Sequence, residues 1–159
     1  MTIAIYPGSF DPITNGHLDI LKSGSEIFDK VIIAVSYNVN KKGFLTVDER
    51  VELIKKSVAH LSNVEVDFFE GLTVEYAKKK GADVLLRGLR SSFDFEYELQ
   101  LSQTNNALNP DLKTIFLITK PEYNFISSSM VREILVNNGD ISKFVPKAVE
   151  EYLITKRDI

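Results

Sequence analysis

Short runs of β-branched and aliphatic residues recur along the chain, and segments with helical periodicity separate them. Four runs are nearly continuous, at 3–6, 31–35, 84–86 and 115–118, and a fifth at 64–69 alternates with polar residues. Continuous apolar runs are typical of parallel strands covered on both faces, whereas alternation is typical of a half-exposed strand. We therefore expect four buried strands and one strand near the edge of a sheet.

The segments between these runs predict helices. Thr46 and Glu49 form a capping-box pair at the start of one of them. Its apolar residues recur every three or four positions and give it one apolar face: Val47, Val51, Ile54, Val58 and Leu61. Weaker helical signals cover 16–28, 72–80, 92–107, 128–136 and 146–156. The alternation predicts an α/β fold, a single Rossmann-like doubly wound domain with a five-stranded parallel sheet and helices on both faces.

The segment 92–107 differs from the other predicted helices because it carries two apolar stripes. Phe93, Tyr97 and Leu101 make one stripe, and Phe95 and Leu99 make the other. We expect this helix to bury two sides, one of them against another subunit.

Length and composition narrow the class of protein. The 159 residues fit one domain, 1–159, and the net charge of −3 opposes binding of a nucleic acid polymer. The chain has no cysteine, which favours the cytoplasm and excludes thiolate metal sites. Its longest aliphatic run, 31–35, is too short to cross a membrane, so we expect neither export nor membrane insertion. The two histidines lack ligand spacing, so no protein-bound metal site is expected.

The segment 6–17, Tyr-Pro-Gly-Ser-Phe-Asp-Pro-Ile-Thr-Asn-Gly-His, joins a predicted strand to a predicted helix. Open α/β sheets bind ligands at such junctions, and the free N–H groups of a helix start attract phosphate. His17 would lie in the first turn of that helix. The alternative is a plain turn in which Thr14 caps the helix and His17 is a solvated residue without a chemical role.

Two of the five arginines in the chain flank one glycine at the end of a predicted strand, in Leu-Arg-Gly-Leu-Arg-Ser at 86–91. The planar guanidinium is suited to phosphate because it offers five N–H donors in a fixed fork. The alternative is that these arginines form ion pairs with nearby acids such as Asp94 or Glu98. The residues alone leave both possibilities open.

A third junction carries three consecutive serines, in Phe-Ile-Ser-Ser-Ser-Met-Val-Arg at 125–132. Their hydroxyls, the free N–H groups of the helix start and the arginine that follows could together hold a triphosphate. N-capping by one serine is the alternative, but it accounts for only one of the three. A basic loop, Asn-Lys-Lys-Gly at 40–43, is a weaker candidate. The sequence contains neither the dinucleotide-binding glycine pattern nor a Walker loop.

In four blocks the chain resembles the phosphopantetheine adenylyltransferases, a family of the nucleotidyltransferase superfamily with an H/T-x-G-H motif. The blocks are 6–17, Arg-Gly-Leu-Arg at 87–90, Asp-Phe-Glu-Tyr-Glu at 94–98 and Phe-Ile-Ser-Ser-Ser at 125–129. The resemblance implies transfer of the adenylyl group of ATP to 4′-phosphopantetheine, with Mg²⁺. The products would be 3′-dephospho-coenzyme A and pyrophosphate, in the penultimate step of coenzyme A biosynthesis. It also implies a homohexamer and feedback inhibition by coenzyme A.

The resemblance assigns roles to individual residues. His17, Lys41 and Arg90 would be catalytic, and His17 would stabilise the transition state. Phosphopantetheine would be bound by Ser9, Lys41, Thr73 and Arg87. The ATP site would comprise Ser9, Phe10, His17, Gly88, Leu89, Arg90, Glu98, Tyr123, Asn124, Phe125, Ile126, Ser127, Ser128 and Ser129. Three of these depart from the residues most frequent in the family: Ser9 replaces threonine, Thr73 an apolar residue and Tyr123 tryptophan.

The implied chemistry needs no acid/base pair. A phosphate monoester is already anionic at pH 7, so it attacks the α-phosphorus of ATP directly while the protein positions the reactants and neutralises charge. Two other functions stay open. One is a related nucleotidyltransferase that uses CTP or a different phosphorylated acceptor, and the other is a catalytically silent nucleotide sensor on the same fold.

Overall fold

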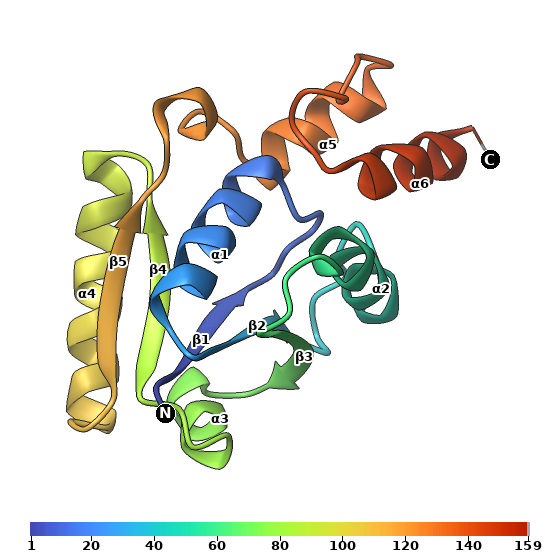
Figure 1. The fold of residues 1–159 in the computed structure, drawn as a ribbon. Helices are drawn as coiled ribbons and strands as arrows, with labels where there is room; N and C mark the ends of the chain where they lie inside the picture. The colour runs from blue at the N-terminus through green and yellow to red at the C-terminus, as the bar shows by residue number, and fades with distance from the viewer. Residues whose placement is uncertain (159) are drawn as a thin grey trace.

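The computed structural model describes residues 1–158, and a five-stranded parallel sheet forms its centre (Figure 1). The strands are β1 (Ile3–Gly8), β2 (Lys30–Tyr37), β3 (Val64–Glu70), β4 (Val84–Leu89) and β5 (Lys113–Ile118). Their order across the sheet is β3-β2-β1-β4-β5. The chain therefore builds outward from β1 in one direction and then, from β4 onward, in the other, so the topology switches between β1 and β4.

Helices connect and flank the strands. They are α1 (Asn15–Ile27), α2 (Val47–Val58), α3 (Thr73–Lys79), α4 (Ser92–Leu108), α5 (Ser128–Val136) and α6 (Lys147–Arg157), with a short 3₁₀ helix, η1 (Pro121–Tyr123). The expected α/β fold with its five parallel strands is confirmed, and each predicted helix is present with bounds that differ by a few residues. No helix within residues 1–158 is long and apolar enough to span a bilayer.

Successive residues of the central strands face two apolar layers. On one face of the sheet, Tyr6 and Ile33 pack with side chains of α1, α2, α5 and α6. On the other face, Ile5 and Ile32 pack with side chains of α3. Burial on both faces explains why the sequence of β1 and β2 is apolar without alternation.

The two edge strands differ from each other in how well the sequence predicts them. β3 comes from the alternating run at 64–69 and forms one edge, as expected. β5 forms the other edge, and the expectation that the run 115–118 is buried is wrong, because Ile115 and Ile118 are 36% and 83% exposed. A strand at the edge has a neighbour on one side only, so an apolar run alone does not ensure burial.

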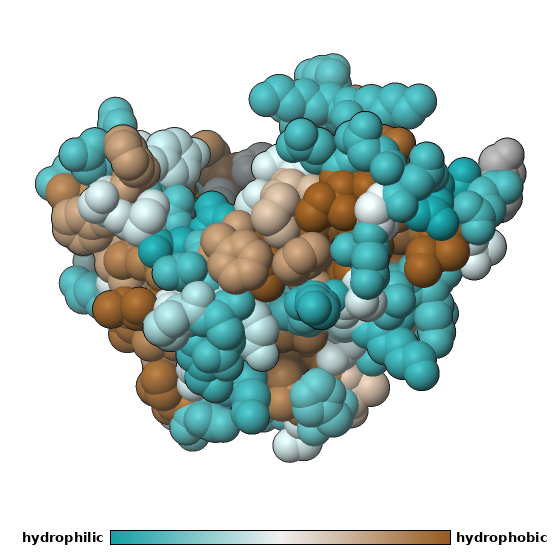
Figure 2. Space-filling model, turned by 90° about the horizontal axis from the view of Figure 1, so that it is seen from above, coloured by the Kyte–Doolittle hydropathy of each residue, from teal (hydrophilic) through white to brown (hydrophobic). Residues whose placement is uncertain are grey.

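The helix α4 does not bury the two apolar stripes expected of it. Glu98 is its one buried residue, whereas Phe93 and Tyr97 are 84% and 65% exposed. Hydrophobic side chains accordingly appear on the surface at the α4 and β5 side of the molecule, at the left of Figure 2. The expectation of two buried sides is therefore wrong within this chain, and coverage by another subunit stays a prediction.

Candidate active site

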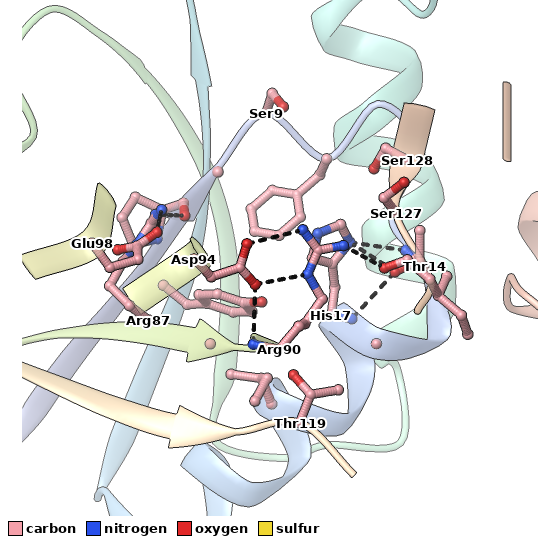
Figure 3. A pocket seen from close by; sticks show the side chains of 18 residues that line it. Ser9, Thr14, His17, Arg87, Arg90, Asp94, Glu98, Thr119, Ser127 and Ser128 are labelled. Atoms are coloured by element: carbon pink, nitrogen blue, oxygen red, sulfur yellow. Dashed lines mark hydrogen bonds and ion pairs between the residues drawn. The ribbon is translucent and has the colours of Figure 1, made fainter. Parts of the chain in front are cut away.

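A cavity of about 260 Å³ lies at the carboxyl ends of β1 and β4, next to the starts of α1 and α5 (Figure 3). This is the switch point of the sheet, where open α/β folds bind their ligands. All three sequence motifs contribute to its wall. The predicted site residues that line it are Ser9, Phe10, His17, Arg87, Gly88, Arg90, Glu98, Ile126, Ser127 and Ser128.

Two further cavities adjoin the first one. Lys41 lines the larger, of about 1170 Å³, and Thr73 lines the smaller, of about 210 Å³. Ser9 lines all three cavities, and Arg87 lines the first and the smallest. Lys41 is thus separated from the cavity of His17 and Arg90. Predicted residues that line none of these cavities are Leu89, Tyr123, Asn124, Phe125 and Ser129.

A capping box at the start of α1 holds the ring of His17. Thr14 is the N-cap, and its hydroxyl accepts a hydrogen bond from the His17 N–H at 3.3 Å. In return, the Thr14 N–H donates to Nδ1 of His17 at 3.0 Å. Because Nδ1 accepts this hydrogen bond, the proton of the neutral ring lies on Nε2. Thr14 therefore caps α1, as the alternative interpretation expected, but His17 also lines the cavity.

The environment of His17 favours the neutral ring. Burial, and then the positive charges of Arg90 and Arg87, lower the pKa of His17 to about 4. The ring also packs edge-on against Phe10, with the ring centroids 5.0 Å apart. At pH 7 the side chain is therefore an uncharged imidazole whose Nε2–H is a hydrogen-bond donor.

Arg87 lies within β4 rather than beyond it, because the strand continues to Leu89. Its Nε and Nη2 donate to the two carboxylate oxygens of Glu98, at 2.8 Å and 2.5 Å, and its Nη1 donates to the Pro7 carbonyl at 2.8 Å. Burial disfavours the charged guanidinium, but the hydrogen bonds and charge of Glu98 outweigh it and raise the pKa of Arg87. Arg87 is thus held in place as a cation.

Arg90 follows β4 and is held in a similar way. Its Nε donates to Asp94 at 3.1 Å, and its Nη1 donates to the Ile126 carbonyl at 2.8 Å (Figure 3). The ion pairs with Asp94 and Glu98 that the sequence suggested are therefore both formed. They leave a role in phosphate binding open, because a guanidinium has five N–H donors and each arginine uses three among the described residues.

The serine run has divided roles. Ser127 is the N-cap of α5 and accepts from the Met130 N–H at 3.1 Å, whereas the Ser128 hydroxyl donates to the Pro12 carbonyl at 2.7 Å. The Ser129 hydroxyl lies 3.2 Å from that of Ser127. Arg132, expected beside a triphosphate, instead donates Nη1 to the Asp11 carbonyl at 2.7 Å. This part of α5 is thereby fastened to the loop after β1.

Sequence reasoning missed several residues around the site. Thr119 lines the first cavity and directly follows β5, so its position after a strand end is a signal that could have found it. Asp11 and Arg50 line the largest cavity and contact each other. A buried pair between a loop residue and a residue of α2 has no local signal in the sequence.

Comparison with known proteins defines the class of this chain. Residues 5–134 match the family model described as cytidylyltransferase-like, so the chain is a member of this family of nucleotidyltransferases. A solved structure titled as a putative nicotinate-nucleotide adenylyltransferase from Vibrio parahaemolyticus has the same fold. Its TM-score is 0.76 at 22% sequence identity, and the match covers 99% of this chain and 94% of that one.

Within this class, the chain belongs to the phosphopantetheine adenylyltransferases. One such protein from Caldanaerobacter subterraneus subsp. tengcongensis is 51% identical over 156 residues, which cover 98% of each chain. Another, from Clostridium botulinum strain Eklund 17B, is 49% identical over 159 residues, which cover 100% of both chains. The family resemblance seen in four sequence blocks is thereby confirmed over the full length.

Proposed function

We propose that this protein transfers the adenylyl group of ATP to 4′-phosphopantetheine. A phosphate oxygen of phosphopantetheine attacks the α-phosphorus of ATP in line, and the bond from that phosphorus to the leaving pyrophosphate breaks. The products are 3′-dephospho-coenzyme A and pyrophosphate, with no covalent enzyme intermediate. The observation that supports this most directly is a neutral imidazole with a fixed tautomer, placed with two arginines at the switch point of the sheet.

His17 acts as a donor to the transition state in this proposal. Negative charge grows on the α-phosphate oxygens as the bonds to phosphorus rearrange. An Nε2–H held in place by Thr14 strengthens its hydrogen bond to one of these oxygens at that moment, without having to reorient. Because the ring is neutral, it gives up no proton and acts through this hydrogen bond alone.

The cavities support a division of the two substrates. Arg87 borders the cavities of His17 and of Thr73, so it can hold the phosphate of phosphopantetheine while the pantetheine arm extends towards Thr73. Arg90 faces the α-phosphate in this arrangement. Ser127 and the N–H groups at the start of α5 receive the β- and γ-phosphates, because a helix start favours anions.

Lys41 lines a different cavity from His17 and Arg90. It lines the largest cavity, which meets the other two at Ser9. A flexible lysine on an exposed loop can reach the acceptor phosphate at this junction and offset its charge. The structure is therefore compatible with the predicted role of Lys41 in binding phosphopantetheine, although the residue lies apart from His17.

Mg²⁺ would enter the site on ATP. Residues 1–158 contain no group of three or more His, Cys, Asp or Glu side chains that could hold a metal ion. The two carboxylates beside the cavity, Asp94 and Glu98, are each engaged by an arginine. These residues do not fit a resident magnesium site, and the triphosphate oxygens are the ligands we propose.

The assembly and regulation of the protein belong to the same proposal. The exposed apolar residues Phe93 and Tyr97 of α4 and Ile118 at the end of β5 would be covered in a homohexamer. Coenzyme A would inhibit the enzyme by occupying the phosphopantetheine site, since it carries the same pantetheine arm. Sedimentation of the purified protein and product-inhibition kinetics test these two points.

Pyrophosphate release tests the proposed reaction. The purified enzyme is given ATP with 4′-phosphopantetheine, ATP with nicotinamide mononucleotide, or CTP with 4′-phosphopantetheine. We expect release in the first mixture only, and loss of that release in the His17→Ala variant. Release in only one of the other mixtures would assign a different nucleotidyltransferase activity, and binding of ATP without release in any mixture would favour a nucleotide sensor.

A further inference from the structure

A buried ion pair joins the loop after β1 to helix α2, and each of these segments adjoins a predicted substrate-binding residue. Asp11 lies in the loop after β1, two residues from Ser9, and Arg50 lies in α2, which follows the loop of Lys41. The side chains of Asp11 and Arg50 are 11% and 8% exposed, and Oδ1 of one lies 3.5 Å from Nε of the other. The mechanism described above gives neither residue a role.

Residues 38–46 join β2 to α2 and form the Lys41 loop. The carboxylate of Asp11 binds backbone N–H groups near the end of this loop. The Phe44 N–H donates to Oδ2 and the Leu45 N–H donates to Oδ1, each at 2.8 Å. Two consecutive N–H groups are therefore bound by the two oxygens of one side chain. Charge-assisted hydrogen bonds of this kind fix orientation as well as position.

Arg50 contacts the backbone of the same two loops. Its Nε donates to the Leu45 carbonyl at 3.0 Å, and its Nη1 donates to the Ser9 carbonyl at 3.3 Å. The guanidinium of Arg50 thus links Ser9, which lines all three cavities, to Leu45 at the base of the Lys41 loop. Gly43 makes room for this guanidinium, because a Cβ at that position would lie 1.7 Å from Nη2.

We infer that Asp11 and Arg50 are positioning residues that set the Lys41 loop relative to Ser9 and so prepare the cavity for the phosphate of the acceptor. This inference rests on the proposed function, which makes Lys41 and Ser9 ligands of that phosphate. Lys41 is exposed and has a flexible side chain, so an unanchored loop would have to be ordered each time substrate binds. Anchoring the base of the loop lowers that entropic cost.

Steady-state kinetics of Asp11→Asn and Arg50→Gln test the inference. We expect each variant to raise KM for phosphopantetheine by about tenfold, the effect of one or two lost charge-assisted hydrogen bonds. KM for ATP and kcat should change much less. Lys55→Gln is the matched control, because it removes a positive charge from the same helix at a side chain that is 54% exposed.

A second variant guards against misfolding of these two. Gly43→Ala keeps both charged residues but would place a methyl group 1.7 Å from Nη2 of Arg50, so the guanidinium must shift and KM for phosphopantetheine should rise in the same way. Thermal unfolding of each variant shows whether the fold is kept. If Gly43→Ala and the folded ion-pair variants all keep a normal KM for phosphopantetheine, the inference is overturned.

A double-mutant cycle separates positioning from a general loss of structure. If Arg50 acts through Lys41, then Arg50→Gln should change KM for phosphopantetheine less than about twofold in a Lys41→Ala background. An equal fold-change in both backgrounds would contradict the inference.

Hydrogen exchange of the substrate-free protein provides a readout that does not depend on the proposed function. The Phe44 and Leu45 amides should exchange at least tenfold faster in Asp11→Asn than in the unaltered protein, because each donates to that carboxylate. If the unaltered protein releases no pyrophosphate, the proposed function fails while this exchange still reports on the anchor. Unchanged exchange in Asp11→Asn would refute the anchoring itself.

Discussion

Arg87 and Glu98 form a two-point ion pair beside the candidate active site, with Nε 2.8 Å from Oε2 and Nη2 2.5 Å from Oε1. Glu98 is the one buried residue of α4, so this pair fastens the helix to β4. If a buried carboxylate loses its cationic partner, the free-energy cost of its desolvation is no longer offset by the attraction between the two charges. The same arginine therefore contributes to the fold as well as to the site.

Arg87→Ala should lower the free energy of unfolding by about 3 kcal/mol, because it leaves the Glu98 carboxylate buried and unpaired. Urea denaturation measures this loss. Arg87→Ala combined with Glu98→Gln should be more stable than Arg87→Ala alone, since the neutral amide is cheaper to bury. A single variant that unfolds at the same urea concentration as the unaltered protein would show that the pair is not buried in solution.

Arg87→Ala should also raise KM for phosphopantetheine more than it lowers kcat. Its guanidinium would contact a phosphate that is present in both the ground state and the transition state, so its loss weakens binding in both. Kinetics below the unfolding temperature of the variant separate this effect from the loss of stability. A normal KM with a collapsed kcat would assign Arg87 to the chemical step instead.

Ser127→Ala and Ser129→Ala should each reduce affinity for ATP less than Arg90→Ala does. The N–H groups at the start of α5 survive truncation of a serine, whereas truncation of Arg90 removes a charged fork. Isothermal titration with ATP measures the three affinities. A serine variant that loses more affinity than Arg90→Ala would reverse the ranking.

Glu49 links α2 to α6 and should make stability depend on pH in the acid range. It accepts hydrogen bonds from Lys156 Nζ at 2.7 Å and from the Tyr152 hydroxyl. Partial burial acts to raise the pKa of Glu49, but these hydrogen bonds outweigh it and lower the pKa to about 2. Since the folded pKa lies below the ordinary value of 4.5, this contribution is complete above pH 4.5 and is lost as the pH falls towards 2.

Glu49→Gln should therefore cost roughly 1 to 3 kcal/mol at pH 7 and progressively less between pH 4.5 and pH 2. Urea unfolding of both proteins across this range gives the difference at each pH. Glu52→Gln on the same helix, at a side chain that is 62% exposed, is the control and should cost little. A cost for Glu49→Gln that does not vary with pH would contradict the assigned ion pair.

The imidazole of His17 should stay neutral, with its proton on Nε2, from pH 8 to about pH 5. The acceptor role of Nδ1 sets the tautomer, and burial with the nearby arginines lowers the pKa. A His60→Gln variant leaves one imidazole in the chain, so its ring nitrogen shifts can be read by nuclear magnetic resonance without overlap. A protonation midpoint near 6.5, or a proton on Nδ1, would disprove this arrangement.

The sequence predicts which segments along the chain form strands and which form helices, because both kinds of element follow from local periodicity. It also places His17 and Arg90 together, since strand ends of a parallel sheet converge. The exposure of Ile115 and Ile118 in β5 was not predictable from the apolar run 115–118, because the burial of a strand depends on which strands lie beside that strand in the sheet.

The partners of the charged residues also escape local reasoning. Whether Arg87 meets Glu98 or a ligand depends on how α4 lies against β4, and the sequence left that choice open. Asp11 comes from the loop after β1 and Arg50 from α2, and the two meet only in the folded chain. Such contacts are tertiary, so no spacing of residues along the chain predicts them.

Single-turnover kinetics of His17→Ala at saturating ATP and phosphopantetheine test whether His17 acts on the transition state. Binding losses vanish at saturation, so only the chemical step is observed. We expect a rate roughly two to three orders of magnitude below that of the unaltered enzyme, with affinity for ATP little changed and the rate of His60→Gln unaffected. A near-normal rate in His17→Ala would contradict this role and would leave His17 as a member of the capping box alone.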